Sequence, residues 1–132
     1  MNTPIMLSGI AGSGTPQPID MGGDLSAART GPVVYIGKAG SYGVDIAWPA
    51  TPGGGTNAAG VFAIQENASE SAARWETIAF CSTAAYLASQ PSGNGVLGGF
   101  CVKNIKTTSP YVRVIYVPTS GGAGVIPVVC VS

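Results

Sequence analysis

Short segments of alternating side chains, separated by glycine and proline, constrain the fold of this chain more than any other feature. In the clearest of them, residues 42–48, large apolar side chains occupy every second position: Tyr42, Val44, Ile46 and Trp48. Because successive side chains of a strand point to opposite faces of a sheet, this pattern predicts a half-buried β-strand. No segment shows a sustained helical period, so we expect an all-β protein.

Further extended segments follow along the chain, at 61–66, 75–80, 99–103, 111–117 and 125–131. The segments between them carry the glycine, proline and asparagine residues that favour turns, at 51–57, 91–95 and 118–124. The last two extended segments are rich in β-branched residues and predict a terminal hairpin. About seven or eight short strands at this spacing predict an antiparallel β-sandwich or jelly roll.

Alternation also predicts which side chains lie inside the sandwich. In 75–80 it places Ile78 and Phe80 on one face of a strand and Trp75 on the other. Six aromatic residues could stack on sugar rings, but alternation places most of them on faces that a sandwich core needs, so we expect most of them in the core: Tyr42, Trp48, Phe62, Trp75, Phe80 and Tyr116. The cysteines stand among apolar neighbours without zinc or redox spacing, which predicts buried thiols at Cys81, Cys101 and Cys130.

The first 30 residues differ from the rest of the chain, because they are rich in Gly, Ser, Ala and Pro and their apolar residues are isolated. Such a segment buries too little surface alone to offset its ordering entropy. We therefore expect an extended N-terminal arm over 1–30 that becomes ordered on another surface, followed by one β-sandwich domain over 31–132. A disordered tail without a role fits the same composition.

The chain contains no histidine. Histidine is the commonest general base near neutral pH and belongs to Ser-His-Asp, Cys-His and most zinc-hydrolase sites, so these chemistries are excluded. Carboxylates remain at Glu66, Glu70 and Glu76, but their segment is polar and turn-like, which favours solvated charges over a glycosidase pair. We expect a protein that is not an enzyme and needs no cofactor and no metal.

Charged residues make up only 9% of the chain, six basic and six acidic. Nucleic-acid binding needs basic residues gathered on one face, and Lys103 and Lys106 are the nearest approach to such a cluster. We therefore expect neither nucleic acid nor a membrane as partner. An exterior so poor in charge is common in proteins packed against neighbours in an assembly, and a secreted β-protein with a neutral surface is the alternative. No signal peptide is expected at the start of the chain.

The segment 111–125, YVRVIYVPTSGGAGV, resembles the ending of small virion proteins of tailed bacteriophages. In such proteins a Tyr-Val-Arg strand, a Thr-Ser-Gly loop and a short final strand close a β-sandwich. The segments 43–48 and 61–66 are similar to the matching early strands. Similar strand and turn patterns also occur in carbohydrate-binding sandwiches.

The resemblance implies a capsid decoration, or cement, protein that is made in the host cytoplasm and bound to the capsid surface of the virion. Its expected partner is the major capsid protein, and its expected state is a homotrimer seated where capsid subunits meet. Cement proteins often anchor by an extended arm, which makes Ile5, Leu7 and Ile10 the expected capsid contacts. The alternative is a tail- or fibre-associated adhesion module that binds host-surface glycans through Trp48 and Trp75.

Overall fold

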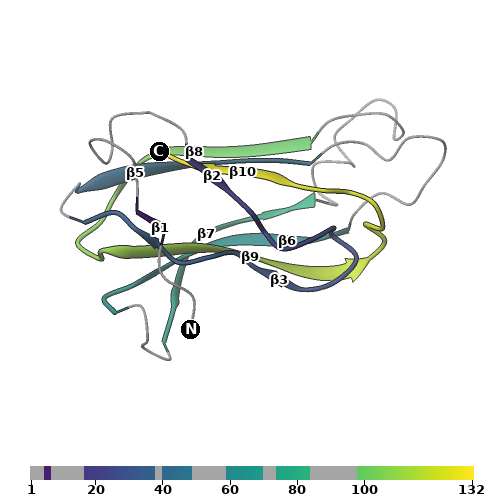
Figure 1. Cartoon of the computed structure of the whole chain (residues 1–132), viewed down its shortest axis with the longest axis horizontal. Coiled ribbons are helices and arrows are strands. Elements are labelled where there is room, and N and C mark those ends of the chain that lie inside the picture. Colours follow the sequence, from purple (N-terminus) through teal and green to yellow (C-terminus); the bar gives the residue numbers. More distant parts are fainter. Residues whose placement is uncertain (1–4, 7–16, 38–39, 49–58, 70–73, 84–97) are drawn as a thin grey trace.

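The computed structural model describes residues 5–6, 17–37, 40–48, 59–69, 74–83 and 98–132 of the chain. Two β-sheets pack face to face as a sandwich, which confirms the expected all-β fold (Figure 1). The ten elements of the described part are all strands. No helix within these residues is long and apolar enough to cross a membrane.

The sandwich is assembled from one sheet that contains β6 and one that contains β5. In spatial order the β6 sheet consists of β1 (Ile5–Met6), β4 (Val34–Tyr35), β9 (Tyr111–Ser120), β6 (Ala59–Asn67) and β7 (Glu76–Ser82), with β3 (Arg29–Thr30) also paired to β9. The β5 sheet consists of β2 (Gln17–Ile19), β10 (Val128–Val131), β5 (Ser41–Trp48) and β8 (Gly98–Lys106). Neighbouring strands are antiparallel, except that β1 runs parallel to β4.

Aromatic rings join the two sheets in the core. The ring of Phe62, on β6, lies 5.5 Å from that of Trp48 on β5 and 4.6 Å from that of Tyr116 on β9, measured between centroids. Aromatic side chains bury large areas, so this cluster contributes strongly to holding the sheets together. Alternation along β5, β6 and β9 supplies further side chains of the hydrophobic core, Tyr42, Val44, Ile46, Ile64, Val112 and Val114.

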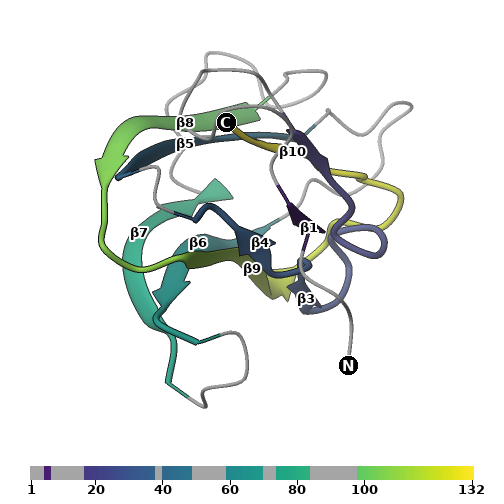
Figure 2. The ribbon, with the colours of Figure 1, turned by 60° about the vertical axis from the view of Figure 1, so that its left-hand side comes forward.

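The last two long strands do not form the terminal hairpin that their sequence predicts. β9 lies in the β6 sheet, whereas β10 lies in the β5 sheet, as Figure 2 shows. Strand β9 is already paired with β6 on one side and with β3 and β4 on the other. The connecting loop therefore carries the chain across the sandwich, and Gly121, Gly122 and Gly124 adopt the positive φ angles that this path requires.

Residues 17–30 belong to the sandwich, which corrects this part of the expected arm over 1–30 and moves the expected domain boundary at residue 31 toward the N-terminus. Their strands β2 and β3 pair with β10 and β9. Ile19, Met21 and Leu25 lie in the hydrophobic core, with at most 6% of each residue exposed. These apolar residues are separated by turns and follow no period, so their burial is visible only in the folded chain.

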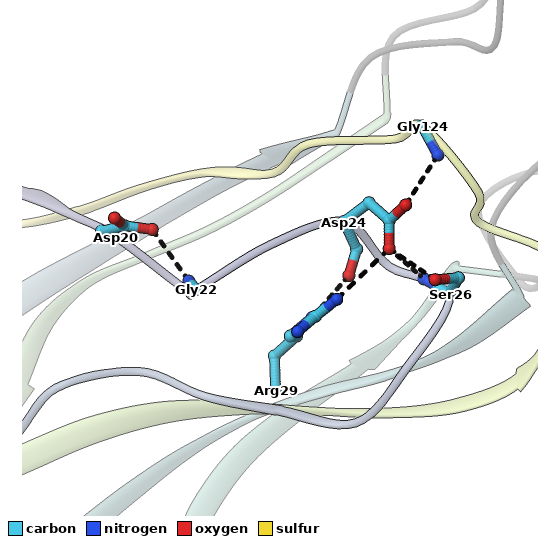
Figure 3. Close-up of polar contacts among 6 residues, drawn as sticks. All are labelled: Asp20, Gly22, Asp24, Ser26, Arg29 and Gly124. Atoms are coloured by element: carbon cyan, nitrogen blue, oxygen red, sulfur yellow. Dashed lines mark hydrogen bonds and ion pairs between the residues drawn. The ribbon is translucent and has the colours of Figure 1, made fainter.

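Hydrogen bonds of Asp24 fasten this segment to the loop before β10 (Figure 3). One carboxylate oxygen accepts a bond from the backbone N–H of Gly124 at 2.9 Å. The other accepts bonds from the N–H and the hydroxyl of Ser26 and from the guanidinium of Arg29. These bonds, above all the one from Gly124, hold the pKa of the Asp24 carboxyl well below its ordinary value of 3.8.

We expect Asp24→Asn to lower the free energy of unfolding at neutral pH and to weaken its dependence on acid. A carboxyl group with a lowered pKa in the folded state stabilises that state above its unfolded pKa, and the contribution is lost as the pH falls through the folded pKa. The Asn side chain does not titrate, and its single amide oxygen cannot accept both the bond from Gly124 and the bonds from Ser26 and Arg29. Urea unfolding between about pH 7 and about pH 2 measures both effects.

The control for this measurement is Asp20→Asn, because the Asp20 carboxylate accepts a hydrogen bond from Gly22 within its own turn. This variant should keep nearly the wild-type free energy of unfolding at neutral pH. An Asp24→Asn variant that loses stability on acidification as steeply as the wild type would contradict the prediction.

Candidate functional site

A β-bulge decides which side chains of β7 point outward. The register between β6 and β7 shifts at Ile64 and Gln65, whose partners are Ala79 and Thr77. The extra residue, Ile78, packs against the core together with Ala79, while Phe80 is 70% exposed. The prediction that Ile78 and Phe80 share a face is therefore wrong, because a bulge interrupts the period of two.

The outer face of the β6 sheet carries an apolar patch, which we define by Val61, Ala63, Phe80, Ile115 and Val117. Cross-strand register places Ala63 between Phe80 and Ile115, and Val61 beside Val117. Phe80 and Val117 are 70% and 53% exposed, Val61 and Ile115 are half-buried, and Ala63 between the strands is only 8% exposed. Contiguous exposed apolar side chains mark surfaces that bind other surfaces, so this patch is the first candidate site.

A polar groove lies at one end of the same sheet, where β6 ends and β7 begins. Its volume is about 580 Å³, and a second hollow of about 450 Å³ shares part of its wall. We define the polar groove by six of its lining residues, Glu66, Asn67, Arg74, Trp75, Glu76 and Ser109. The adjoining hollow adds Lys106 and Thr107 to this wall. The groove is the second candidate site.

The carboxylate of Glu66 occupies a fixed position in the wall of the groove. The residue is only 8% exposed, and its two carboxylate oxygens accept hydrogen bonds from the hydroxyl of Tyr42 at 2.6 Å and from that of Thr107 at 2.7 Å. Burial, and then the Glu66 carboxylate, raise the pKa of the Tyr42 hydroxyl, which therefore remains a donor. Because Tyr42 and Glu66 lie on different sheets, this contact also ties the end of the sandwich together.

Trp75 is half-buried at the opposite wall and is held by a cationic neighbour. The guanidinium carbon of Arg113 lies 4.3 Å from the centre of the Trp75 ring. The Nε of Arg113 donates a hydrogen bond to the side-chain oxygen of Gln65 at 2.8 Å, which fixes the guanidinium. The guanidinium therefore covers one face of the indole and fixes the ring beside the groove.

The two tryptophans that the sequence singles out as glycan contacts have different surroundings. Trp48 is 3% exposed and stacks on Phe62, so its ring is not accessible to a ligand and does not fit that role. Trp75 borders the polar groove, where the predicted contact remains open to test. Among the aromatic residues expected in the core, Trp75 and Phe80 are the two that lie at the surface instead.

The predicted capsid contacts fall only partly within the described residues. Ile5 lies in β1, where its backbone is in register with Val34 of β4. Leu7 and Ile10 lie outside the described residues. Glu70, one of the three carboxylates considered above, also lies outside them.

The prediction of a solvated charge at Glu66 is wrong, because the residue is buried in the wall of the groove. A signal was nevertheless present, because alternation places Glu66 on the same face of its strand as the buried Phe62 and Ile64. A carboxylate in phase with core residues indicates a buried, hydrogen-bonded group. The roles of Arg74 and Lys106 have no comparable signal, since only the fold brings them to the groove.

The cysteines are less buried than their apolar neighbours predict. Cys101 is exposed, and Cys81 and Cys130 are half-buried. Register places Cys101 and Cys130 on either side of Asp45, on the outer face of the β5 sheet. Partial burial, and secondly the charge of Asp45, raise the pKa of the Cys130 thiol, which disfavours the reactive thiolate form.

Metal-ligating side chains do not converge in the part of the chain that the structure describes, where no group of three His, Cys, Asp or Glu residues is placed to hold an ion. The two candidate sites differ in character, one apolar and one polar. Comparison of the chain with protein-family models, with curated proteins and with solved structures finds no match.

Proposed function

We propose that this protein is a non-enzymatic decoration protein of a bacteriophage capsid, which stabilises the assembled head by bridging neighbouring capsid subunits. The observation that carries the proposal is the apolar patch, whose five residues include no charge and whose Phe80 is 70% exposed. A protein that acts by covering another surface needs such a contact face. The low charge of the chain and the resemblance of its last strands to virion proteins support the same function.

The proposed mechanism is thermodynamic linkage. A protein that binds only the assembled shell adds its binding free energy to the stability of that shell. The proposed state is a homotrimer. Three linked copies that bind neighbouring capsid subunits strengthen binding through avidity and match the symmetry of the capsid. Residues Ile5, Leu7 and Ile10 are proposed as further capsid contacts beside the patch.

The patch is tested by co-sedimentation of the purified protein with capsids of the phage that encodes it. We expect the double substitution Phe80→Ala with Val117→Ala to weaken binding by a factor of about 30 or more, since apolar anchors at the centre of an interface dominate its energy. The matched control is Ile126→Ala with Val128→Ala, which removes two aliphatic side chains that are 55% and 60% exposed outside the patch. This control should bind like the wild type.

Two outcomes would contradict the proposal. Wild-type protein that does not sediment with the capsids would rule out the function itself. Equal losses of binding in the patch variant and in the control would rule out the patch as the contact face.

The second candidate function, a glycan-binding adhesion module, is favoured by one observation. Trp75 is a half-buried aromatic residue at a polar groove, as recognition of sugar rings requires. The groove lies beyond the row of Gln65 and Thr77, at the other end of β6 and β7 from the patch residues Val61 and Phe80. Because the two sites are separate, one protein can bind a capsid through the patch and leave the groove accessible.

A further inference from the structure

The polar groove has the volume of a small-molecule site, with a lining that is more polar than that of most such sites. Pockets that bind small ligands enclose about 300–1,000 Å³ and combine apolar surface with a few convergent polar groups. The groove, at about 580 Å³, is lined by one tryptophan together with two glutamates, an asparagine, an arginine and a serine. The adjoining hollow extends the site along the wall formed by Glu66, Glu76 and Ser109.

The charged side chains that line the groove and the adjoining hollow are balanced in number. Glu66 and Glu76 contribute two negative charges, and Arg74 and Lys106 contribute two positive ones. Such a lining has no excess of either sign to attract a charged ligand over an uncharged one. It instead offers donors and acceptors side by side, which suits a ligand rich in hydroxyl groups, since each hydroxyl both donates and accepts.

The key side chains are fixed before any ligand arrives. Two hydroxyl donors orient the buried Glu66 carboxylate, which has about four acceptor positions and so keeps some for a ligand. Arg113 and its bond to Gln65 hold the indole of Trp75. A preorganised site loses little conformational entropy on binding, so the arrangement favours recognition over a chance hollow.

We propose that the polar groove binds an uncharged saccharide, with a sugar ring against the indole of Trp75 and sugar hydroxyls bonded to Glu76, Arg74 and Glu66. A pyranose ring presents a face of C–H groups, which matches the electron-rich face of an aromatic ring, and a rim of hydroxyls, which matches the polar walls. The inference deepens the second candidate function, glycan binding, on which it rests, and it does not depend on capsid binding.

The test begins with an array of neutral hexose and N-acetylhexosamine oligosaccharides, printed beside sialylated and sulfated ones. We expect binding to neutral saccharides only. The neutral oligosaccharide that binds most strongly on the array is then titrated by calorimetry against the wild type, Trp75→Ala and Glu76→Gln. Each variant should weaken the affinity by about tenfold or more. A parallel titration with glucose, galactose and mannose separates recognition of one ring from recognition of a polymer.

The control variant is Phe80→Ala, on the same strand but outside the groove, which should keep the wild-type affinity. Glu76 is exposed, so Glu76→Gln tests the groove even if Trp75→Ala unfolds the protein. The proposal is overturned by an array without neutral hits, by binding of anionic glycans alone, or by equal affinities in the wild type and Glu76→Gln. Capsid co-sedimentation of the groove variants reports on the patch separately, so failure of either proposal is distinguishable from failure of the other.

Discussion

Phe62→Ala should lower the free energy of unfolding by about 3–5 kcal/mol, the cost of truncating a buried aromatic side chain in a packed core. Phe62 is fully buried, and its ring contacts Trp48 of the opposite sheet and Tyr116 of its own. Its loss opens a cavity at the point where the two sheets meet, and the surrounding β-sheet backbone cannot collapse to fill it. Denaturation by urea, followed by the fluorescence of the tryptophans, measures the change.

Phe80→Ala is the matched control for this measurement, since it removes the same side chain from the neighbouring strand. Phe80 is 70% exposed, and truncation of an exposed side chain usually changes stability by no more than about 0.5 kcal/mol. Similar losses in the two variants would show that Phe62 does not join the sheets as described.

Leu25→Ala should cost about 2–5 kcal/mol, the second largest effect that we expect. Leu25 has no exposed surface, and its backbone N–H donates to the carbonyl of Val125 at 3.0 Å. The backbone of Gly122 lies so close to Leu25 that a β-carbon at residue 122 would stand 2.3 Å from the Leu25 carbonyl oxygen. The side chain therefore sits in a tightly packed corner of the core, where a cavity is costly.

This substitution distinguishes a segment that belongs to the sandwich from an arm that lies on a partner. If residues 17–30 were an arm, Leu25→Ala would leave the stability of the isolated protein unchanged and weaken only its binding to the partner. Ile126→Ala serves as control, because Ile126 is a branched aliphatic residue that is 55% exposed. It should change the free energy of unfolding by about 0.5 kcal/mol or less.

The polar network at the end of the sandwich serves both stability and the proposed binding. Glu66 is buried, and such a carboxylate is tolerated in a folded protein only when hydrogen bonds replace its lost hydration. Tyr42 and Thr107 supply these bonds from the β5 sheet and from the turn before β9. The groove is therefore part of the framework of the sandwich, which gives its walls the rigidity that selective binding requires.

The amino-acid sequence by itself determined the all-β class and the position of the long strands. Alternation with a period of two is a local property, because a half-buried strand must present one apolar and one polar face wherever it lies. Ser41–Trp48, Ala59–Asn67 and Tyr111–Ser120 are strands for this reason. The absence of histidine is likewise a fact of composition, and it removes the commonest catalytic sites without any knowledge of the fold.

Only the tertiary structure decided which strands pair, where β7 bulges and which isolated residues are buried. β9 and β10 are adjacent in the chain but lie in different sheets, because neighbours already occupy both edges of β9. Leu25 is buried and Phe80 exposed, although both are large and apolar, since burial depends on contacts with residues distant in the chain. The polar groove joins side chains from β6, β7 and the turn before β9, and long-range packing of this kind leaves no periodic signal in the sequence.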